Sequence, residues 1–355
     1  MKKNIFAIAV LISSLMSLYN SFNVHNTIMD SFKNSHPKEI FKVWHTVYKK
    51  GSEYNINTEL GINKYKTFKA NLQIIEKINK ENRGYTLGIN HLTDKTFDEV
   101  KQYYNLIDFN INDQRNKLRA LASANLDDYE EGANIKPKNL KYNWSAINHT
   151  SFCRPIRDQG QCGSCWAFAT VGLLEALWQL KNNKQLSDDL APQQLVDCDT
   201  TSNGCNGGWI QGPIQYLLKD KYMDFETEYP YTAKDGTCYQ DNVTNHSDIL
   251  TKGLKMSWSA ESVHSILLDG AVGTSVQVTS EFCMYRTGVL NTQCTGWPNH
   301  AVVIVGYGLE NNVEYWLVRN SWGASWGDKG YIKIQRNDAN KSSCHLTECG
   351  VQPQI

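Results

Sequence analysis

The chain has 355 residues, enough for two or three compact units, and its 36 Lys and Arg residues balance 36 Asp and Glu residues. Proteins that bind nucleic acid usually carry a strongly basic face, so this balance indicates no nucleic-acid partner. The charge is unevenly distributed: residues 25–126 hold 16 Lys/Arg against 11 Asp/Glu, and residues 127–355 hold 18 against 25. A basic first part and an acidic second part fit two units that bind each other.

Residues 1–20 have the pattern of a secretory signal peptide. Lys2 and Lys3 precede an apolar run, Ile5 to Leu18, that is too short for an ordinary transmembrane helix. The alternative is a short N-terminal membrane anchor. No later apolar run is long enough to span a bilayer, so we expect no membrane partner. Ten cysteines fit an oxidising compartment, as do five glycosylation sequons, at Asn143, Asn148, Asn242, Asn245 and Asn340.

Residues 35–83 are predicted to be helical. Apolar residues recur there at the spacing of one helix face, with Lys and Glu residues between them. The first stripe consists of Ile40, Phe41, Trp44 and Val47, and the second of Phe68, Leu72, Ile75 and Ile78.

The second stripe also carries a more specific pattern. Phe68, Asn71, Ile75 and Asn79 follow the spacing F-x2-N-x3-I-x3-N. This is similar to the second half of the ERFNIN helix in propeptides of cathepsin L-like enzymes, although Lys64 stands where Arg is usual. Further on, the segment Gly-Ile-Asn-His-Leu-Thr-Asp at 88–94 looks like the propeptide motif G-x-N-x-F-x-D, with Leu in place of Phe. The resemblance implies an inhibitory propeptide over residues 21–130.

Residues 105–135 are polar, contain an acidic run at 127–131, and lack helix or strand periodicity. We interpret them as an exposed linker of the kind that proteases cut. Processing within residues 120–137 would leave a mature unit of about 220 residues, the remainder of the chain.

The stretch Gln159-Gly-Gln-Cys-Gly-Ser-Cys-Trp-Ala-Phe168 places Cys165 after a glycine-rich turn, at the predicted start of a helix. The partial positive charge and free N–H groups of a helix N-terminus favour a thiolate, which is the nucleophilic form of cysteine. The following residues, to Leu180, are apolar on several sides, which predicts a buried helix.

The second half of the mature unit is predicted to be rich in strands, at 301–308, 315–319 and 330–335. His300 lies directly before the first of these strands, and Asn320 directly after the second. They follow Cys165 by 135 and 155 positions.

The sequence around Cys165, together with His300 and Asn320, resembles the papain family of cysteine peptidases. The resemblance implies an α+β papain-like fold over residues 131–355, with a helix-rich subdomain, a β-barrel-like subdomain and the active site in the cleft between them. It implies Cys165 as nucleophile, paired as an ion pair with His300 as base, and Asn320 as the residue that orients His300. Gln159 would contribute to the oxyanion hole, and Trp322 would shield the His300–Asn320 hydrogen bond from water.

The resemblance also implies three disulfides: Cys162–Cys205, Cys198–Cys238 and Cys294–Cys349. Three cysteines, Cys153, Cys283 and Cys344, are then left over, so at least one is free or pairs with another molecule; a Cys283–Cys344 bridge is one option.

By the same resemblance, a pocket takes the side chain of the second substrate residue before the cut (P2). We expect it to be apolar and to prefer Leu, Val or Phe over Arg. The substrate-binding residues are expected to be Gly207, Gly208, Trp209, Ile210, Ser275, Pro298, Ala301 and Trp322.

The leading hypothesis is therefore a cysteine endopeptidase made as a zymogen, whose propeptide is loosened by acid. The alternatives are a cathepsin B-like exopeptidase, an inactive homologue that acts as a binding protein, and a transglutaminase-like transferase. The expected partners are protein and peptide substrates, the chain's own propeptide and cystatin-type inhibitors, and the expected state is a monomer. The sequence shows no metal-ligand cluster and no cofactor motif. A lysosome, a vacuole and the extracellular space all remain open as locations.

Overall fold

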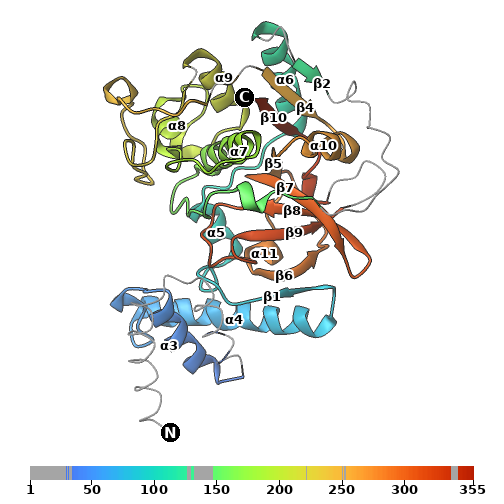
Figure 1. Cartoon of the computed structure of the whole chain (residues 1–355). Coiled ribbons are helices and arrows are strands. Elements are labelled where there is room, and N and C mark those ends of the chain that lie inside the picture. The colour runs from blue at the N-terminus through green and yellow to red at the C-terminus, as the bar shows by residue number, and fades with distance from the viewer. Residues whose placement is uncertain are drawn as a thin grey trace.

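The computed structural model describes residues 29, 31, 34–125, 129–131, 147–220, 222–249, 251, 253–336 and 343–355 (Figure 1). The expected signal peptide lies outside the described residues. Among the helices that are described, none is long and apolar enough to cross a membrane.

The first third of the chain is mainly helical and has two parts. We call residues 34–103 the N-terminal body and residues 104–125 the cleft segment. In Figure 1 most of the body, with α3, α4 and β1, lies at the bottom and α5 lies above them, and the cleft segment leads upward from there to α6. Their elements are α3 (Pro37–Val47), η1 (Ser52–Tyr54), α4 (Glu59–Glu81), β1 (Tyr85–Leu87), α5 (Phe97–Tyr103) and α6 (Ile111–Asn125).

The two apolar stripes expected from the sequence are the buried faces of α3 and α4. Pro37 begins α3, where its missing N–H is no loss, and the Thr58 hydroxyl accepts the Gly61 N–H at the start of α4. The Trp44 ring of α3 packs on the Phe68 ring of α4, with the ring centroids 5.2 Å apart. The helical prediction for residues 35–83 is confirmed, with a break between the two helices.

The asparagines of the α4 motif hold the chain that follows the helix. The Asn79 side chain exchanges two hydrogen bonds with the Leu87 backbone, at 2.9 and 2.8 Å. The Asn71 amide donates to the carbonyls of Thr93 and Lys95, both at 2.9 Å. An amide suits both positions, because at Asn79 it donates and accepts at once and at Asn71 its nitrogen supplies two donors.

The prediction of a structureless linker over residues 105–135 is wrong. Residues 111–125 form the helix α6, and Tyr129–Glu131 form the strand β2. Ile111 and Leu118, seven residues apart, are buried against the rest of the protein. Such a short and mostly polar helix is stabilised by its tertiary contacts rather than by its own periodicity, which is why the sequence does not reveal it.

The C-terminal unit, residues 147–355, is helix-rich in its first half and strand-rich in its second, as predicted. We call residues 147–249 the helix half and residues 253–355 the sheet half. The predicted helix after Cys165 is α7, and the predicted strands are β7, β8 and β9. The elements are β3 (Ile147–Asn148), η2 (Thr150–Phe152), α7 (Cys165–Asn182), α8 (Pro192–Cys198), η3 (Gly204–Asn206), α9 (Gln211–Asp220), η4 (Gln240–Asn242), β4 (Gly253–Ser257), α10 (Ala260–Leu267), β5 (Val272–Val276), α11 (Ser280–Cys283), β6 (Tyr285–Leu290), β7 (His300–Glu310), β8 (Val313–Arg319), β9 (Tyr331–Gln335), η5 (Ser343–His345) and β10 (Gly350–Gln354).

The strands form one sheet in the order β1-β6-β9-β8-β7-β5-β10-β4-β2, with β3 paired to β7. Strand β1 of the N-terminal body pairs antiparallel with β6 at one end of this order. Strand β2 pairs parallel with β4 at the other end. The N-terminal third therefore contributes a strand at both ends of the sheet.

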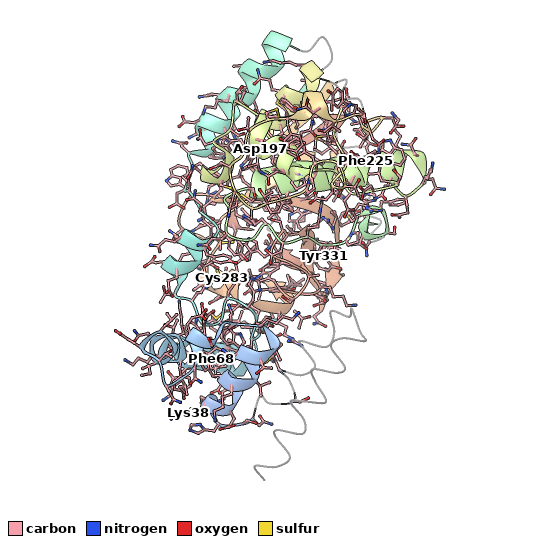
Figure 2. The ribbon with its side chains drawn as sticks, turned by 90° about the vertical axis from the view of Figure 1, so that its left-hand side faces the viewer. Lys38, Phe68, Asp197, Phe225, Cys283 and Tyr331 are labelled. Carbon is pink, nitrogen blue, oxygen red and sulfur yellow. A yellow bond between two sulfur atoms is a disulfide. The ribbon has the colours of Figure 1, made fainter. Side chains whose placement is uncertain are left out.

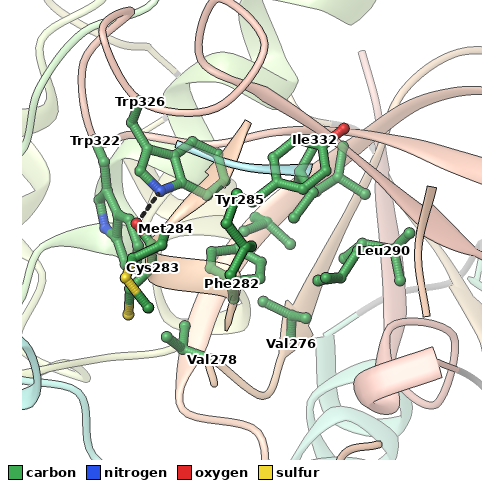
Figure 3. Packing of buried hydrophobic residues seen from close by; sticks show 14 of the residues in the cluster. Val276, Val278, Phe282, Cys283, Met284, Tyr285, Leu290, Trp322, Trp326 and Ile332 are labelled. Carbon is green, nitrogen blue, oxygen red and sulfur yellow. Dashed lines mark hydrogen bonds between the residues drawn. The ribbon is translucent and has the colours of Figure 1, made fainter. Parts of the chain in front are cut away.

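Two apolar cores hold the molecule together. One joins the N-terminal body to the sheet half, and Figure 3 shows its centre, where Phe282, Trp322 and Trp326 pack together. There the Trp326 indole donates to the carbonyl of Cys283, at 3.1 Å. The other core lies around α7 and includes Ile111 and Leu118 of α6. In the side view the body and the helix half lie at opposite ends, with Cys283 between them (Figure 2).

The structure contains two of the three disulfides that the resemblance implies, Cys162–Cys205 and Cys198–Cys238. The expected Cys294–Cys349 bridge is wrong, because Cys294 pairs with Cys344, and the Cys283–Cys344 option fails with it. The physical reason is placement. Cys344 lies in a turn, and its Cα is 4.9 Å from the Cα of Cys294. Cys349 is instead buried in the core around α7. The free cysteines among the described residues are Cys153, Cys165, Cys283 and Cys349.

Candidate active site

Cys165 is the first residue of α7 and is almost fully buried. Ser164 precedes it at the N-cap position. Backbone N–H groups of Ala301, Trp166 and Cys165 itself are directed at the sulfur. The helix N-terminus and the strand that begins at His300 thus meet at this one atom.

His300 is fully buried, and its Nε2 lies 2.7 Å from Asn320 Oδ1. The same oxygen accepts the backbone N–H of Ser321, at 2.8 Å, which identifies it as the oxygen rather than the nitrogen of the amide. His300 Nε2 must therefore be the donor, and in the neutral ring Nδ1 carries the lone pair. Among the described residues, Nδ1 has no hydrogen-bond partner.

The Trp322 ring lies beside this pair. Its centroid is 4.9 Å from that of the His300 ring, at 40° between the planes, and the side chain has no exposed surface. The indole therefore excludes water from the His300–Asn320 hydrogen bond, in the position that the sequence led us to expect.

Gln159 lies under the same site, fully buried. Its Nε2 donates to the Cys162 carbonyl at 3.0 Å, and its Oε1 accepts the Ser321 hydroxyl at 2.7 Å. A carbonyl can only accept, so these contacts fix which end of the amide is the nitrogen. One hydrogen of Nε2 remains for a further acceptor near Cys165.

The charge state differs from the expected ion pair. Burial raises the pKa of the Cys165 thiol to about 11, and the N–H groups directed at it offset this only in part. Burial also lowers the pKa of His300 to about 4, which the hydrogen bond to Asn320 partly opposes. Between these values both groups are neutral in this form of the protein. Removing water from the site disfavours both charged forms.

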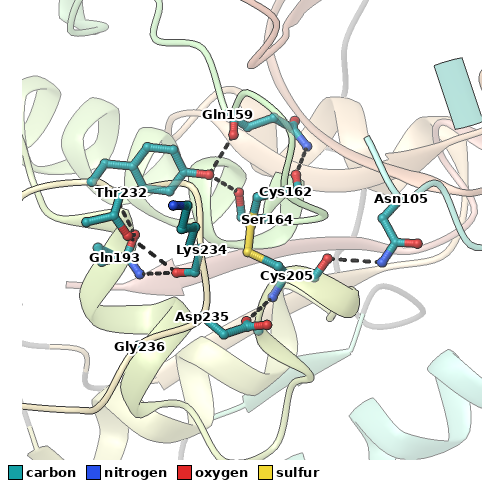
Figure 4. The surroundings of a disulfide bond; sticks show 12 residues. Asn105, Gln159, Cys162, Ser164, Gln193, Cys205, Thr232, Lys234, Asp235 and Gly236 are labelled. Carbon is teal, nitrogen blue, oxygen red and sulfur yellow. Dashed lines mark hydrogen bonds between the residues drawn. A yellow bond between two sulfur atoms is a disulfide. The ribbon is translucent and has the colours of Figure 1, made fainter. Parts of the chain in front are cut away.

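The cleft segment covers the site on one side through Tyr104 and Asn105. The Tyr104 ring stacks on Trp322 with centroids 4.4 Å apart and planes 2° from parallel. The Asn105 amide donates to the Cys205 carbonyl at 3.0 Å, beside the Cys162–Cys205 disulfide (Figure 4). Cys205 also accepts the N–H of Gly163, two residues before Cys165, at 2.8 Å.

The next residues continue along the cleft. Asp108 accepts the Asn299 amide at 3.0 Å, next to His300. The Phe109 N–H donates to the Pro298 carbonyl at 3.0 Å, and its ring lies 3.9 Å from the ring of Trp209. The chain from 104 to 109 thus spans the site from Trp322 to Trp209.

A cavity beyond Phe109 contains most of the expected P2-pocket residues. Only about 10 Å³ of it is free, scarcely enough for one water, and Phe109 and Gln114 of the cleft segment are among its lining residues. Pro298 is not among its lining residues; it contacts the cleft segment through its carbonyl. A larger cavity of about 580 Å³ lies along α4 and touches none of the site residues. The expected residues in the smaller cavity are Gly208, Trp209, Ile210, Ser275 and Ala301.

Gly207 and Gly208 of the expected substrate-binding segment are each required to be glycine, but for different structural reasons. Gly207 has φ of +103°, which other residues rarely adopt, and a Cβ there would lie 3.3 Å from Ile107 in the cleft segment. A Cβ at Gly208 would instead lie 2.7 Å from atoms of Ser202 and Trp166. Gly208 is therefore required by packing inside the helix half.

Four residues of the C-terminal unit line this pocket but did not emerge from the sequence as substrate-binding residues: Gln211, Thr274, Cys349 and Val351. Cys349, expected in a disulfide, lines the cavity as a free thiol, and Thr274 lies beside Ser275. Spacing could not have chosen between Cys344 and Cys349 as the partner of Cys294, since they are five residues apart.

Comparison with known proteins identifies the class. Residues 139–354 match the papain family of cysteine proteases, and residues 41–100 match the cathepsin propeptide inhibitor domain (I29). The chain belongs to the papain family of cysteine proteases, as the sequence led us to expect, and it is a zymogen with its propeptide in place.

Individual relatives agree with this assignment. Thiol protease aleurain from Arabidopsis thaliana is 35% identical over 319 residues, which cover 86% of this chain and 81% of that protein. Pro-cathepsin H from Bos taurus is 33% identical over 327 residues, covering 90% and 91%. The structure of digestive procathepsin L2 proteinase from Tenebrio molitor is similar with a TM-score of 0.76 at 29% identity, over 90% of this chain and 100% of that one.

Proposed function

We propose that the chain is the zymogen of a cysteine endopeptidase of the secretory pathway, with Cys165 as nucleophile. Residues 1–20 would be the signal peptide, 21–130 the propeptide and 131–355 the peptidase domain. The observation that carries the proposal is the path of the cleft segment. Its residues 104–109 cross a site in which a helix-terminal cysteine lies against the strand that begins at His300, a histidine already oriented by an asparagine.

Departure of the cleft segment admits water to Cys165 and His300. Burial is the main cause of both pKa shifts, so hydration lowers the pKa of the thiol and raises that of the imidazole. The proton then passes from Cys165 to His300 Nδ1, which carries the lone pair. The N–H groups at the start of α7 stabilise the thiolate that forms.

In the acylation step, the thiolate attacks the carbonyl carbon of the scissile peptide bond. The oxygen becomes an oxyanion, which accepts hydrogen bonds from the Cys165 N–H and from the remaining hydrogen of Gln159 Nε2. The bond to nitrogen then breaks, and His300 Nδ1 protonates the leaving amine. Cys165 is left as a thioester.

Deacylation uses the same groups in reverse order. Neutral His300 takes a proton from water, whose oxygen attacks the thioester carbonyl. Collapse of the oxyanion expels the Cys165 thiolate and releases a carboxylic acid. Throughout, Asn320 holds the ring in one orientation without adding a charge that would alter the Cys165–His300 proton transfer.

We propose that the pocket lined by Trp209, Ile210 and Ala301 receives an apolar P2 side chain, with Leu, Val or Phe preferred over Arg. The contact of the Phe109 ring with Trp209 supports an apolar occupant. A peptide library that varies P2 tests this directly, and a preference for Arg would contradict the assignment.

Two other functions make different predictions. A cathepsin B-like exopeptidase would remove residues only from chain ends, but the sequence has no paired-histidine insertion to block the cleft. An inactive binding protein would fold and be processed without hydrolysing peptides. The presence of Gln159, Cys165, His300 and Asn320 argues against it.

The experiment is acid activation of the purified precursor. After incubation at pH 4.5 with a reductant, it should hydrolyse a fluorogenic Leu-Arg peptide and also cut inside a peptide blocked at both ends. The Cys165→Ala precursor should do neither. Processing of the wild type without any hydrolysis would support the binding protein instead, and hydrolysis of unblocked peptides alone would support the exopeptidase.

We also propose a cellular location and inhibitory partners for the protein. The disulfides fit passage through the secretory pathway, with a lysosome, a vacuole or the extracellular space as destination. Of the five sequons, Asn148, Asn242 and Asn245 are exposed among the described residues. We also propose a monomer that is inhibited by cystatin-type proteins, which occupy the same cleft as substrates.

A further inference from the structure

One tyrosine hydroxyl connects the two backbone segments that carry the proposed oxyanion donors. Tyr231 Oη lies 2.6 Å from the carbonyl oxygen of Gln159 and 2.6 Å from the hydroxyl of Ser164. Figure 4 shows Gln159 and Ser164 beside the Cys162–Cys205 disulfide. Gln159 would supply one oxyanion donor, and Ser164 directly precedes Cys165, whose N–H would supply the other.

The directions of these two hydrogen bonds are fixed by chemistry. The Gln159 carbonyl can only accept, so the single proton of Tyr231 is donated to it. The contact between the two hydroxyls then has Ser164 as donor and Tyr231 as acceptor. The result is one continuous path, from Ser164 through Tyr231 to Gln159, without a competing arrangement of protons.

Tyr231 is itself held at both ends. Its ring meets the Phe168 ring of α7 edge-on, with centroids 4.7 Å apart. Its backbone N–H donates to Glu226 at 2.9 Å, and the other oxygen of Glu226 lies 3.5 Å from the guanidinium of Arg157. Arg157 is two residues before Gln159, so the same carboxylate ties Tyr231 to the start of the Gln159 loop.

The hydroxyl also keeps its proton. Burial is the main cause that holds the pKa of Tyr231 above its ordinary value, and the hydrogen bond from Ser164 opposes this only in part. The donor to Gln159 is therefore present across the whole range in which a peptidase of this class works.

We propose that Tyr231 is a positioning residue for the oxyanion hole, which sets the separation between the Gln159 side chain and the N–H of Cys165. This inference rests on the proposed peptidase function. Tyr231 does not touch substrate. It acts through Gln159 and Ser164, whose carbonyl and hydroxyl it holds at a common point.

The separation matters because an oxyanion hole works only when both donors reach the same oxygen. A catalytic group must be held within about 0.5 Å of its productive position. Loss of one donor reduces kcat by about 10²–10³. Loss of its positioning should cost less, and we expect about a tenfold decrease in kcat with KM changed by less than about twofold.

The test uses the full-length precursor, processed at acid pH, with Tyr231→Phe compared to wild type. A peptide aldehyde forms a tetrahedral adduct with Cys165 and needs the oxyanion hole, so its affinity should fall about as much as kcat. Iodoacetamide alkylates the thiolate without forming an oxyanion, so its rate should not change. A general loss of structure would instead lower both, together with the melting temperature.

Tyr229→Phe is the matched control. Tyr229 lies two residues away, is fully buried, and directs its hydroxyl to Asp197 at 3.1 Å, away from Gln159 and Cys165. This variant should lose some thermal stability and keep the wild-type affinity for the aldehyde.

A double-mutant cycle separates positioning from other effects. If Tyr231 acts through Gln159, then Tyr231→Phe should have little further effect on kcat in a Gln159→Ala background. Equal losses in both backgrounds would overturn the proposal, as would a Tyr231→Phe enzyme with unchanged kcat and aldehyde affinity.

If Tyr231→Phe fails to fold, Ser164→Ala is the second variant, because it removes the donor to the same hydroxyl. Unchanged aldehyde affinity in Ser164→Ala would overturn the proposal equally. Failure of the proposed function looks different, because the processed wild type would then neither hydrolyse peptides nor bind the aldehyde.

Discussion

The N-terminal third of the chain meets the C-terminal unit in two regions that are built differently. The N-terminal body shares a continuous apolar core with the sheet half and adds β1 to the sheet. The cleft segment buries four apolar side chains in the two cores, Tyr104, Leu106, Ile111 and Leu118, and otherwise contacts the domain through single hydrogen bonds and ring contacts. The region that blocks the chemistry is the one with less buried apolar surface.

This difference implies that the two regions have separate roles, which we call the division of labour: one binds the domain and the other closes the site. Apolar burial supplies most of the free energy of association, so the body should determine how tightly the propeptide is bound. The cleft segment should determine only whether the site is open. Weakening the body should therefore release inhibition far more than an equal change in the cleft segment.

The largest effect should come from Trp44→Ala in the body. The Trp44 side chain is fully buried, and its indole donates to the Asn90 carbonyl at 2.8 Å. Truncation of such a residue costs about 3–5 kcal/mol. Differential scanning calorimetry of Trp44→Ala on a Cys165→Ala background should show a first unfolding transition at a much lower temperature. The Trp44→Ala precursor that keeps Cys165 should hydrolyse peptides at pH 7. Ile74→Ala on the exposed face of α4 is the control and should change neither.

The second effect concerns pH and His91, which hydrogen-bonds Tyr104 at 2.8 Å where the body joins the cleft segment. Burial, followed by the charges of Lys50 and Lys95, lowers the pKa of His91 from 6.5 to about 3. Asp94 forms ion pairs with both lysines, at 3.7 and 3.9 Å, and so offers His91 no free counter-charge.

The sign of the pH effect follows from that shift. The unfolded chain binds the proton more tightly than the folded precursor, so the stability due to neutral His91 is complete above pH 6.5 and decreases as pH falls toward 3. The loss at pH 4.5 is on the order of 2 kcal/mol. His91→Gln, which can keep a bond to Tyr104, should require a lower pH for half-maximal processing, whereas His45→Gln should process as wild type. An unchanged pH profile for His91→Gln would show that other groups sense the acid.

A matched pair of asparagines compares the two regions directly. The Asn90 amide donates to the Cys283 carbonyl at 2.8 Å in the buried core, and the Asn105 amide donates to the Cys205 carbonyl at 3.0 Å in the cleft. Loss of a buried hydrogen bond that leaves an acceptor unpaired costs about 1–3 kcal/mol, and loss of a more exposed one costs less. Asn90→Ala should therefore increase activity of the precursor at pH 7 more than Asn105→Ala. The reverse order would contradict the division of labour.

The smallest effect should come from Arg115→Ala in α6. The Arg115 side chain donates to the Glu348 carbonyl at 3.0 Å and lies 5.7 Å from the centre of the Trp258 ring. A cation–π contact of this kind contributes about 0.5–1 kcal/mol. Half-times of processing at pH 5 should shorten by only a few-fold. A change as large as that of Trp44→Ala would mean that the cleft segment also anchors the propeptide.

The sequence predicted those features that depend on local pattern. Regular apolar spacing identified α3, α4, α7 and three strands of the sheet. The motif around Cys165 predicted a nucleophile at the start of a helix, and Cys165 is the first residue of α7; the structure also brings the Asn320 side chain to His300 as the sequence led us to expect. Such features are readable because their residues are close in the chain or follow a fixed period.

The features that escaped prediction depend on contacts between distant residues. Helix α6 is stabilised because Ile111 and Leu118 are buried in the core around α7, a contact that its own sequence does not encode. The pairing of Cys294 depends on the turn at Cys344, since Cys349 is equally available in the sequence. The neutral state of Cys165 reflects burial under a segment that is sixty residues earlier in the chain.

The order of the strands has a consequence for the enzyme after maturation. In the precursor the sheet ends on β1 and β2, three residues each, which leave few backbone groups open. Loss of β1 would expose one edge of β6, which is six residues long, and cleavage after Glu131 would also expose one edge of β4, which is five residues long. Open strand edges are templates for association between molecules. The precursor should therefore resist association between molecules better than the mature enzyme. The solubility of the mature enzyme at high concentration would depend on how those two edges are covered.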